Sequence, residues 1–253
     1  MSTTLHHGEA LAYMASLAPG SIDAIIADPP YLTTNLHFDK APSMDWAAWW
    51  AQAWRVVKPS GVVVLFAADL FTVDLILTQR ANYRYRLVWE KSRPSGFLDA
   101  SRRPLRSHED VLVFGRQPNG STYNPQRTPR TGPNKGTTIS PGTTKHYGGY
   151  LPASYTDDGT RHPTTVVRFG SVESASALHP TQKPLDLMRW LVRTYTNPGD
   201  TVLDCFAGSG STLAACLMEG RHGVGCELDA GYYAKATARL QAIEAAPMLA
   251  FAP

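Results

Sequence analysis

Apolar residues follow two alternating patterns along this chain. Short, almost uninterrupted apolar runs predict buried strands at 22–27, 61–67, 85–91, 110–116, 201–206 and 222–228. Segments with apolar residues three or four positions apart predict helices at 9–17, 45–57, 69–80, 184–195, 211–220 and 230–246. Strands that alternate with helices in this way are typical of a doubly wound α/β fold, in which helices cover both faces of a mostly parallel sheet.

The expected helix ends carry residues that usually start and stop helices. Asp45 and Asp69 stand where an N-terminal cap is expected for the second and third helix. Pro59 and Gly61 are expected to end the second helix, and Gly220 the fifth.

The periodic pattern is lost in the middle of the chain. From Gln117 to about Pro163, Gly, Pro, Thr and Asn recur every few residues. A stretch of that length without regular structure is usually functional or disordered. We therefore expect one domain in two halves, 1–116 and 171–253, interrupted by an insertion over 117–170.

The composition is that of an ordinary globular protein. The 253 residues are 43% hydrophobic and 18% charged, and no apolar run approaches the roughly 20 residues of a membrane span. The N-terminus lacks the basic and apolar regions of a signal peptide, so a cytoplasmic location is expected. The three cysteines have no C-x-x-C spacing and are expected to be buried thiols rather than a disulfide or a zinc site.

Basic residues are concentrated in the middle third. Residues 80–170 contain 15 Lys and Arg against 6 Asp and Glu, whereas the rest of the chain has more acidic than basic residues. An acidic body with a basic middle favours a polyanionic partner over an ordinary solvated surface.

A glycine-rich turn joins one expected strand to the next helix. Residues 204–212 read DCFAGSGST, and glycines there let a ligand approach the backbone and the N–H groups of a helix N-terminus. The turn is no phosphate-binding Walker loop, because the lysine of that motif is absent. Glu227 ends the following strand, where an acidic residue either accepts hydrogen bonds from a ribose diol or caps the helix near Ala230. The combination favours a bound nucleoside.

The strand at 22–27 ends in Asp28-Pro29-Pro30-Tyr31. If it lies beside the strand at 201–206, a nucleoside on the glycine loop faces these residues. The Asp28 carboxylate and a rigid proline carbonyl can accept the two N–H bonds of a nucleobase amine, which frees the nitrogen lone pair. Tyr31 offers a face on which a base can stack. The alternative is a simple turn with a capping aspartate and a core tyrosine.

These segments together resemble the β class of S-adenosylmethionine-dependent amino-methyltransferases of DNA. Asp28–Tyr31 is similar to the catalytic motif of that family, and Asp204–Gly210 to its methionine-binding loop. His179–Pro184, HPTQKP, is similar to a segment that helps to hold the cofactor. The second position of the loop is commonly proline in the family but is Cys205 here, which should not affect binding through backbone groups.

The order of the motifs also resembles the β class. The catalytic motif precedes the insertion and the cofactor loop follows it, which implies a Rossmann-like sheet with a circularly permuted motif order and an inserted target-recognition region. The resemblance runs from residue 5 to about 243 and is weakest in the insertion. Residues 89–116 further resemble the short, stand-alone enzymes of phages and prophages.

The resemblance implies S-adenosyl-L-methionine as the cofactor, whereas spacing alone indicates only a nucleoside. The implied catalytic residues are Asp28, Pro29, Pro30 and Tyr31. The implied cofactor contacts are Glu9, near the cofactor's adenine, Ala10, Asp28, Thr181, Lys183, Asp204, Phe206, Ala207, Gly208, Ser209, Gly210, Thr212, Glu227 and Leu228. Direct methyl transfer needs no metal, and no Cys or His cluster has metal-ligand spacing.

A base inside duplex DNA is out of reach, so methyltransferases rotate the target nucleotide out of the helix. The segment 32–42 either closes over the extruded base or is an ordinary connector. The expected DNA contacts are Thr33, Thr34, Asn35, Lys91, Arg93, Arg102, Arg103, Arg106, Arg127 and Arg130. Double-stranded DNA is the expected partner, and a homodimer is possible because the family often dimerises.

Adenine N6 is the expected target, because enzymes of the family that act on cytosine N4 more often carry Ser in place of Asp28. Cytosine N4 is the alternative within the family, and its amine has the same geometry. RNA or a protein amide is disfavoured by the basic insertion and the β-class order. A non-catalytic DNA-binding module is disfavoured by the intact Asp28 and glycine loop.

Overall fold

A computed structural model describes residues 1–31, 44–132, 136–140, 143–144, 148–149, 153–172 and 177–245. The chain divides into two compact units, Met1–Asn124 with Thr165–Pro253, and Pro125–Thr164. The expected insertion over 117–170 contains the second unit. None of the described helices is long and apolar enough to cross a membrane.

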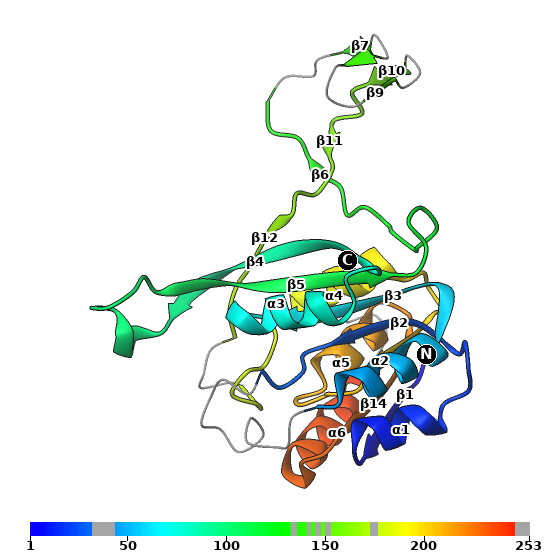
Figure 1. The fold of residues 1–253 in the computed structure, drawn as a ribbon, viewed down its shortest axis with the longest axis vertical. Helices are drawn as coiled ribbons and strands as arrows, with labels where there is room; N and C mark the ends of the chain where they lie inside the picture. Colours follow the sequence, from blue (N-terminus) through cyan, green and yellow to red (C-terminus); the bar gives the residue numbers. More distant parts are fainter. Residues whose placement is uncertain are drawn as a thin grey trace. The chain divides into compact units, whose positions relative to one another are not determined.

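The first unit is built on an eight-stranded sheet (Figure 1). The strand order is β1-β14-β13-β2-β3-β5-β4-β12, and every neighbouring pair is parallel except those that β5 makes with β3 and β4. The strands are β1 Thr3–His7, β2 Ile22–Ala27, β3 Val57–Ala67, β4 Tyr83–Ser95, β5 Arg106–Gly115, β12 Val166–Phe169, β13 Thr201–Asp204 and β14 His222–Glu227. The expected mostly parallel sheet is confirmed.

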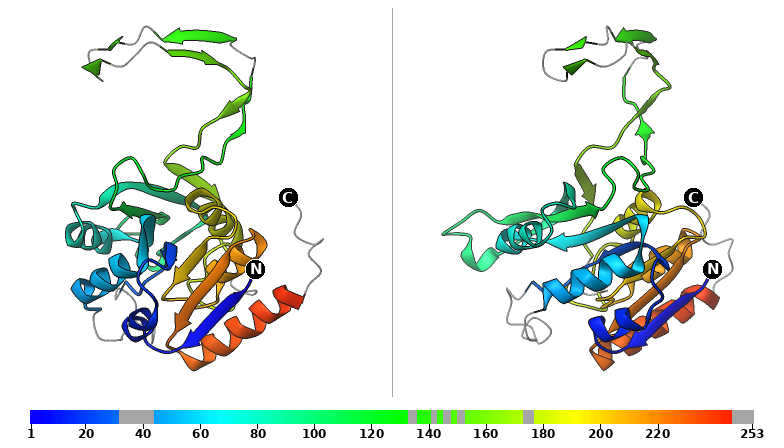
Figure 2. Two further views of the ribbon diagram at one scale, coloured as in Figure 1. Left: turned by 90° about the vertical axis from the view of Figure 1, so that its right-hand side faces the viewer. Right: turned by 45° about the vertical axis from the view of Figure 1, so that its right-hand side comes forward.

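Helices lie on both faces of this sheet (Figure 2). Side chains alternate along β2: Ile25 and Ala27 enter the core under α1, α2 and α3, whereas Ala24 and Ile26 enter the core under α4 and α5. The helices are α1 Ala10–Ser16, α2 Trp46–Val56, α3 Asp69–Thr78, α4 Leu185–Tyr195, α5 Ser211–Met218 and α6 Ala230–Ala245. Burial on both faces explains why β2 is apolar at nearly every position.

One of the two predicted aspartate caps is wrong. Asp45 caps α2, since its Oδ1 accepts a hydrogen bond from Ala48 N at 3.0 Å. Asp69 instead begins α3 with a positive φ of 53°, and the cap residue Ala68 has no side-chain hydrogen bond. The Asp69 carboxylate turns to Arg106 on β5, at 2.8 Å, so a tertiary ion pair replaces the local cap.

The two edge strands β1 and β12 were not expected from the sequence. Each pairs with one neighbouring strand, and most residues along it are exposed or half-buried, with Val167 of β12 the buried exception. An edge strand does not need the continuous apolar run that marks a central strand. β4 and β5 are also longer than expected and form a hairpin closed by a 3₁₀ turn, η2 Phe97–Asp99.

The second unit consists of short antiparallel pairs. The strands pair as β6 Thr128–Pro129 with β11 Thr160–Arg161, β7 Thr137–Ser140 with β10 Ala153–Thr156, and β8 Thr143–Thr144 with β9 Gly148–Gly149. Two ion pairs, Arg127 with Asp158 and Arg130 with Asp157, join its two chain segments.

The topology brings the expected site together. β13 pairs directly with β2, in the register of Leu203 with Ile25, so Asp204, the last residue of β13, and Asp28, the residue after β2, lie at the ends of neighbouring parallel strands. The predicted adjacency of the two strand ends is thus confirmed. β14 and β1 are the next strands of the sheet beyond β13, and His7 at the end of β1 pairs with Glu227 at the end of β14.

Candidate active site

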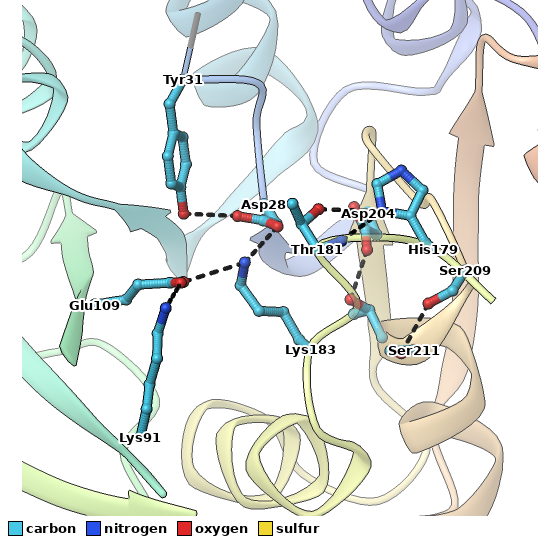
Figure 3. A network of polar contacts seen from close by, with 11 residues as sticks. Asp28, Tyr31, Lys91, Glu109, His179, Thr181, Lys183, Asp204, Ser209 and Ser211 are labelled. Atoms are coloured by element: carbon cyan, nitrogen blue, oxygen red, sulfur yellow. Dashed lines mark hydrogen bonds and ion pairs between the residues drawn. The ribbon is translucent and has the colours of Figure 1, made fainter. Parts of the chain in front are cut away.

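Asp28 follows directly after β2 and is held from two sides (Figure 3). The Tyr31 phenol donates a hydrogen bond to Asp28 Oδ1 at 2.8 Å, and Lys183 Nζ donates one to Oδ2 at 2.5 Å. Burial raises the pKa of Asp28, and the ammonium of Lys183 acts against that rise. The carboxylate therefore has a fixed orientation at the edge of the sheet.

Lys183 lies between two carboxylates. Its side chain is 7% exposed, and its Nζ lies 3.2 Å from Glu109 Oε2 on β5 as well as contacting Asp28. The other oxygen of Glu109 forms an ion pair with Lys91 of β4. Burial alone would lower the pKa of Lys183, but Asp28 and Glu109 outweigh it and the pKa is raised. Lys183 is thus a buried ammonium next to Asp28.

The glycine loop after β13 is shaped by Asp204. Its carboxylate accepts hydrogen bonds from Phe206 N at 3.0 Å and from Thr212 Oγ1 at 2.5 Å, which ties the strand end to the start of α5. Burial raises the pKa of Asp204 to about 7, although both hydrogen bonds act in the opposite direction. Gly208 and Gly210 have φ of 51° and 71°, a region that favours glycine.

Glu227 connects β14 to this loop. Its Oε2 accepts a hydrogen bond from Gly208 N at 2.7 Å, and its Oε1 one from Asp229 N at 2.8 Å. The helix cap is Asp229, whose Oδ1 accepts from Tyr232 N at 2.9 Å. Each Glu227 oxygen keeps a further lone pair for a ribose hydroxyl.

Glu9 and Ala10 follow β1, one strand further along the same edge. The Glu9 side chain caps α1 by accepting a hydrogen bond from Ala12 N at 2.9 Å, and Ala10 is buried in the core. Gly8 N donates to the Glu227 carbonyl at 3.0 Å, which holds the two strand ends together. Leu228, beside Glu227, is exposed.

The segment before α4 lies against the glycine loop. The His179 ring is 3.7 Å from the position that a Cβ on Gly208 would take, and its centroid is 4.2 Å from that of Tyr232. Thr181 N donates to His179 Nδ1 at 3.2 Å. Burial and the nearby Lys183 lower the pKa of His179 to about 4. Residues 179–183 therefore link the loop after β13 to Asp28.

The residues expected to contact DNA differ in their exposure and in their ion-pair partners. Arg102 and Arg103 lie at the tip of the β4–β5 hairpin with side chains 83% and 54% exposed, and share the carboxylate of Asp99. Lys91 is largely buried against Glu109, and Arg130 is 6% exposed against Asp157. Arg93 lies on β4 before the tip. Arg106 pairs with Asp69, and Arg127 pairs with Asp158. Thr33, Thr34 and Asn35 lie outside the described residues.

Glu109 was not expected as a site residue. It stands in the segment HED, directly before the apolar run VLVF of β5. Two adjacent acidic residues directly before an apolar run are the sequence signal that points to it.

The chain matches the DNA methylase family of the N6/N4 type over residues 22–238. It belongs to this family. The DNA methylase is 26% identical to the Type II methyltransferase M.BglII of Bacillus subtilis, over 90% of this chain and 66% of that protein. It is 28% identical to the DNA adenine methyltransferase YhdJ of Escherichia coli (strain K12), over 94% of this chain and 82% of that protein.

Solved structures of methyltransferases have the same fold. The M1.HpyAVI–SAM complex is 25% identical and has a TM-score of 0.61, with 94% of this chain and 98% of that chain covered. The PvuII DNA methyltransferase (cytosine-N4-specific) has a TM-score of 0.67 at 14% identity, with 96% and 91% covered, which shows the fold alone.

S-adenosyl-L-methionine is the cofactor of this DNA methylase, and the residues at the strand ends fit it. The positive φ of Gly208 and Gly210 allows the tight turn between β13 and α5 that is typical of a nucleoside-binding loop. Glu227 faces that loop with acceptor capacity to spare, and Asp28 follows the adjacent strand.

Proposed function

We propose that this DNA methylase transfers a methyl group from S-adenosylmethionine to the exocyclic N6 of adenine in duplex DNA. The observation that carries the proposal is the position of the Asp28 carboxylate, at the end of β2 and beside the glycine loop of β13. Asp rather than Ser at the first motif position favours adenine. The relative YhdJ, named a DNA adenine methyltransferase, supports the same choice.

The residues of this site act on the amine. Asp28 accepts one N–H of the amine, and a proline carbonyl of Pro29-Pro30 accepts the other, so that the nitrogen lone pair is no longer delocalised into the base. The cofactor supplies the methyl group on a sulfonium, from which it passes directly to that lone pair. A positive charge then develops on the nitrogen, and the fixed Asp28 carboxylate stabilises it. The methylated nitrogen then gives up one proton to the surrounding water, and the cofactor would leave as the neutral thioether.

Cofactor binding is assigned to residues at the C-terminal ends of β13, β14 and β1. Glu227 accepts hydrogen bonds from the ribose, and the backbone from Asp204 to Gly210 contacts the methionine part. Glu9 is the proposed contact of the adenine ring, which requires its carboxylate to serve the ligand as well as the cap of α1. Thr181, whose Oγ1 lies 3.1 Å from His179 Nδ1, is a further proposed contact of the cofactor.

The proposed DNA surface includes the hairpin of β4 and β5. β4 is antiparallel to β5, β5 is antiparallel to β3, and β3 is parallel to β2. The C-terminal end of β4 therefore lies on the same side of the sheet as the C-terminal end of β2, which Asp28 follows. The hairpin tip exposes Arg102 and Arg103 there, and among the described residues both pair with the single carboxylate of Asp99. Target recognition is proposed for the Pro125–Thr164 unit. Homodimerisation stays a prediction.

The test is methylation of unmodified DNA by the purified protein with S-adenosylmethionine, followed by digestion to nucleosides and mass spectrometry. We expect N6-methyladenine, and its formation by the Asp28→Ala variant should be slower by about 100-fold or more. N4-methylcytosine alone would reassign the base within the family. Methylated RNA or protein with unmodified DNA would refute the assignment of the substrate.

A further inference from the structure

Four side chains of alternating charge form a continuous chain that ends on Asp28 (Figure 3). Lys91 pairs with Glu109 Oε1, Glu109 Oε2 lies 3.2 Å from Lys183 Nζ, and Lys183 Nζ lies 2.5 Å from Asp28 Oδ2. They come from β4, from β5, from the segment before α4 and from the end of β2. None of the four side chains is more than 21% exposed.

Burying these four charges is an unfavourable way to stabilise the fold. Removing four charged groups from water is unfavourable, and apolar residues of similar volume at such positions are often equally or more stable. Lys183 Nζ also lies 4.8 Å from the centroid of the Phe66 ring, and this cation–π contact offsets only part of the cost of burying the ammonium. Since the last member of the chain is the carboxylate assigned to the substrate amine, the charges are best explained by what they do to Asp28.

We propose that Glu109 is a positioning residue for methyl transfer, which acts through Lys183 to keep the Asp28 carboxylate oriented and available to the substrate amine. The proposal rests on the proposed function. With Glu109 in place, Lys183 divides its attraction between two carboxylates, and the four charges sum to zero. Without it, Lys183 binds Asp28 alone and an uncompensated positive charge remains beside the nitrogen on which positive charge develops.

Glu109→Gln tests this because it preserves the shape of the side chain. We expect kcat to fall by about 10-fold or more, less than the roughly 10²-fold or greater loss for a group that touches the reacting atoms, because Glu109 acts through Lys183. The KM for S-adenosylmethionine should change little, because the glycine loop and Glu227 do not contact Glu109. Glu109→Asp, which retains the charge, should recover part of the lost kcat.

Charge compensation separates an electrostatic role from a structural one. The double variant Lys91→Gln/Glu109→Gln returns the chain to zero net charge, and we expect its kcat to exceed that of Glu109→Gln. The matched control is Glu90→Gln on β4, whose exposed carboxylate pairs with Arg168 at 2.8 Å and does not contact Lys183. This control should retain the activity of the wild type.

The titration of Asp28 provides a readout that does not depend on the substrate. The charged and titratable groups around it are Lys183, Glu109, Tyr31 and, at the end of the neighbouring strand β13, Asp204, while His179 faces Lys183. Glu109 raises the pKa of Asp28, so Glu109→Gln should move its titration to lower pH. Carbon-13 labelling of aspartate carboxyls, with Asp28→Asn to assign the resonance, measures this by NMR.

Two results would overturn the proposal: an unchanged Asp28 titration in Glu109→Gln, or a kcat of that variant equal to the wild type. A kcat lost together with thermal stability and not improved in the double variant would reduce Glu109 to a structural residue. Failure of the proposed function is distinct, because it is the absence of methylated nucleosides with the wild-type protein.

Discussion

The phenol of Tyr31 donates a hydrogen bond to Asp28 Oδ1 at 2.8 Å, while its ring centroid lies 5.1 Å from that of Phe71. The hydroxyl thus occupies one acceptor position of the carboxylate that we assign to the substrate amine. The ring is the part of Tyr31 proposed to stack on the base. The two roles belong to different atoms of one side chain and can be separated by substitution.

Tyr31→Phe should keep kcat within a few-fold of the wild type, because the ring remains and the amine replaces the lost hydrogen bond to Asp28. Tyr31→Ala should weaken the complex with substrate DNA by about 1–3 kcal/mol, the range for stacking of a base on an aromatic ring. DNA titrations and single-turnover rates of both variants check this. Equal losses in both variants would assign the function to the hydroxyl instead.

Asp28→Ala should lower the transfer rate by about 10²-fold or more, by analogy with the loss of one oriented electrostatic group. S-adenosylmethionine should still bind, because Asp204, Gly208 and Glu227 are unchanged. Equilibrium binding of the cofactor to the variant, alongside its turnover, checks both parts. The assignment of Asp28 does not survive near-normal turnover.

Glu227→Ala should weaken cofactor binding by about 1.5–3 kcal/mol, the scale of hydrogen bonds to a charged group. Part of this loss comes from the loop, because Glu227 also holds Gly208 N at 2.7 Å. Asp229→Ala is the matched control, since it removes the cap of α6 but leaves Glu227 in place. Calorimetry that finds equal affinities for the two variants would reduce Glu227 to a structural role.

The central part of the fold follows from the sequence because its strands are buried on both faces. β2 was predicted with the observed ends, and β13 and β14 within two residues. β1 and β12 are edge strands with mixed burial, so their residues do not form an apolar run. Asp69 shows a second limit, because an ion pair with a distant strand overrides a local capping preference.

Only part of the candidate site was predictable, because several of its contacts join residues that are far apart in the sequence. The motif at Asp28 and the glycine loop are local in sequence, and the parallel sheet brings them together. The contact of Lys183 with Asp28 spans 155 residues, and the contacts of Glu109 depend on the register of β4 with β5. The DNA contact of Lys91 stays a prediction, while its pairing with Glu109 depends on the register of the two strands and could not be read from the sequence.

Arg102 and Arg103 should contribute to a steep salt dependence of DNA binding. On duplex DNA, log K falls by roughly 0.9 per neutralised phosphate for each tenfold increase in salt. Arg102→Gln/Arg103→Gln should therefore flatten this slope. The control is Lys58→Gln, which removes a half-exposed charge paired with Asp23 at the opposite edge of the sheet. Fluorescence anisotropy over a salt series measures the slopes, and equal slopes would place the DNA surface elsewhere.

His179 should make the stability of the protein depend on pH. Its pKa is about 4 in the folded protein and 6.5 for the ordinary side chain, because burial and Lys183 oppose its charged form. The unfolded chain therefore binds more protons between these values. The stability contributed by neutral His179 is complete above pH 6.5 and is lost as the pH falls toward 4.

His179→Gln removes this titration. Urea unfolding of both proteins at a series of pH values gives the difference in their free energies of unfolding, and this difference should change in favour of the variant as the pH falls from 6.5 to about 4. Asp204 acts in the opposite direction, since its raised pKa favours the folded state at low pH and this stability is lost as the pH rises through about 7. Because both proteins contain Asp204, its contribution largely cancels in the difference. A difference that is constant over this pH range would show that His179 titrates normally, and that burial against the glycine loop does not hold it neutral.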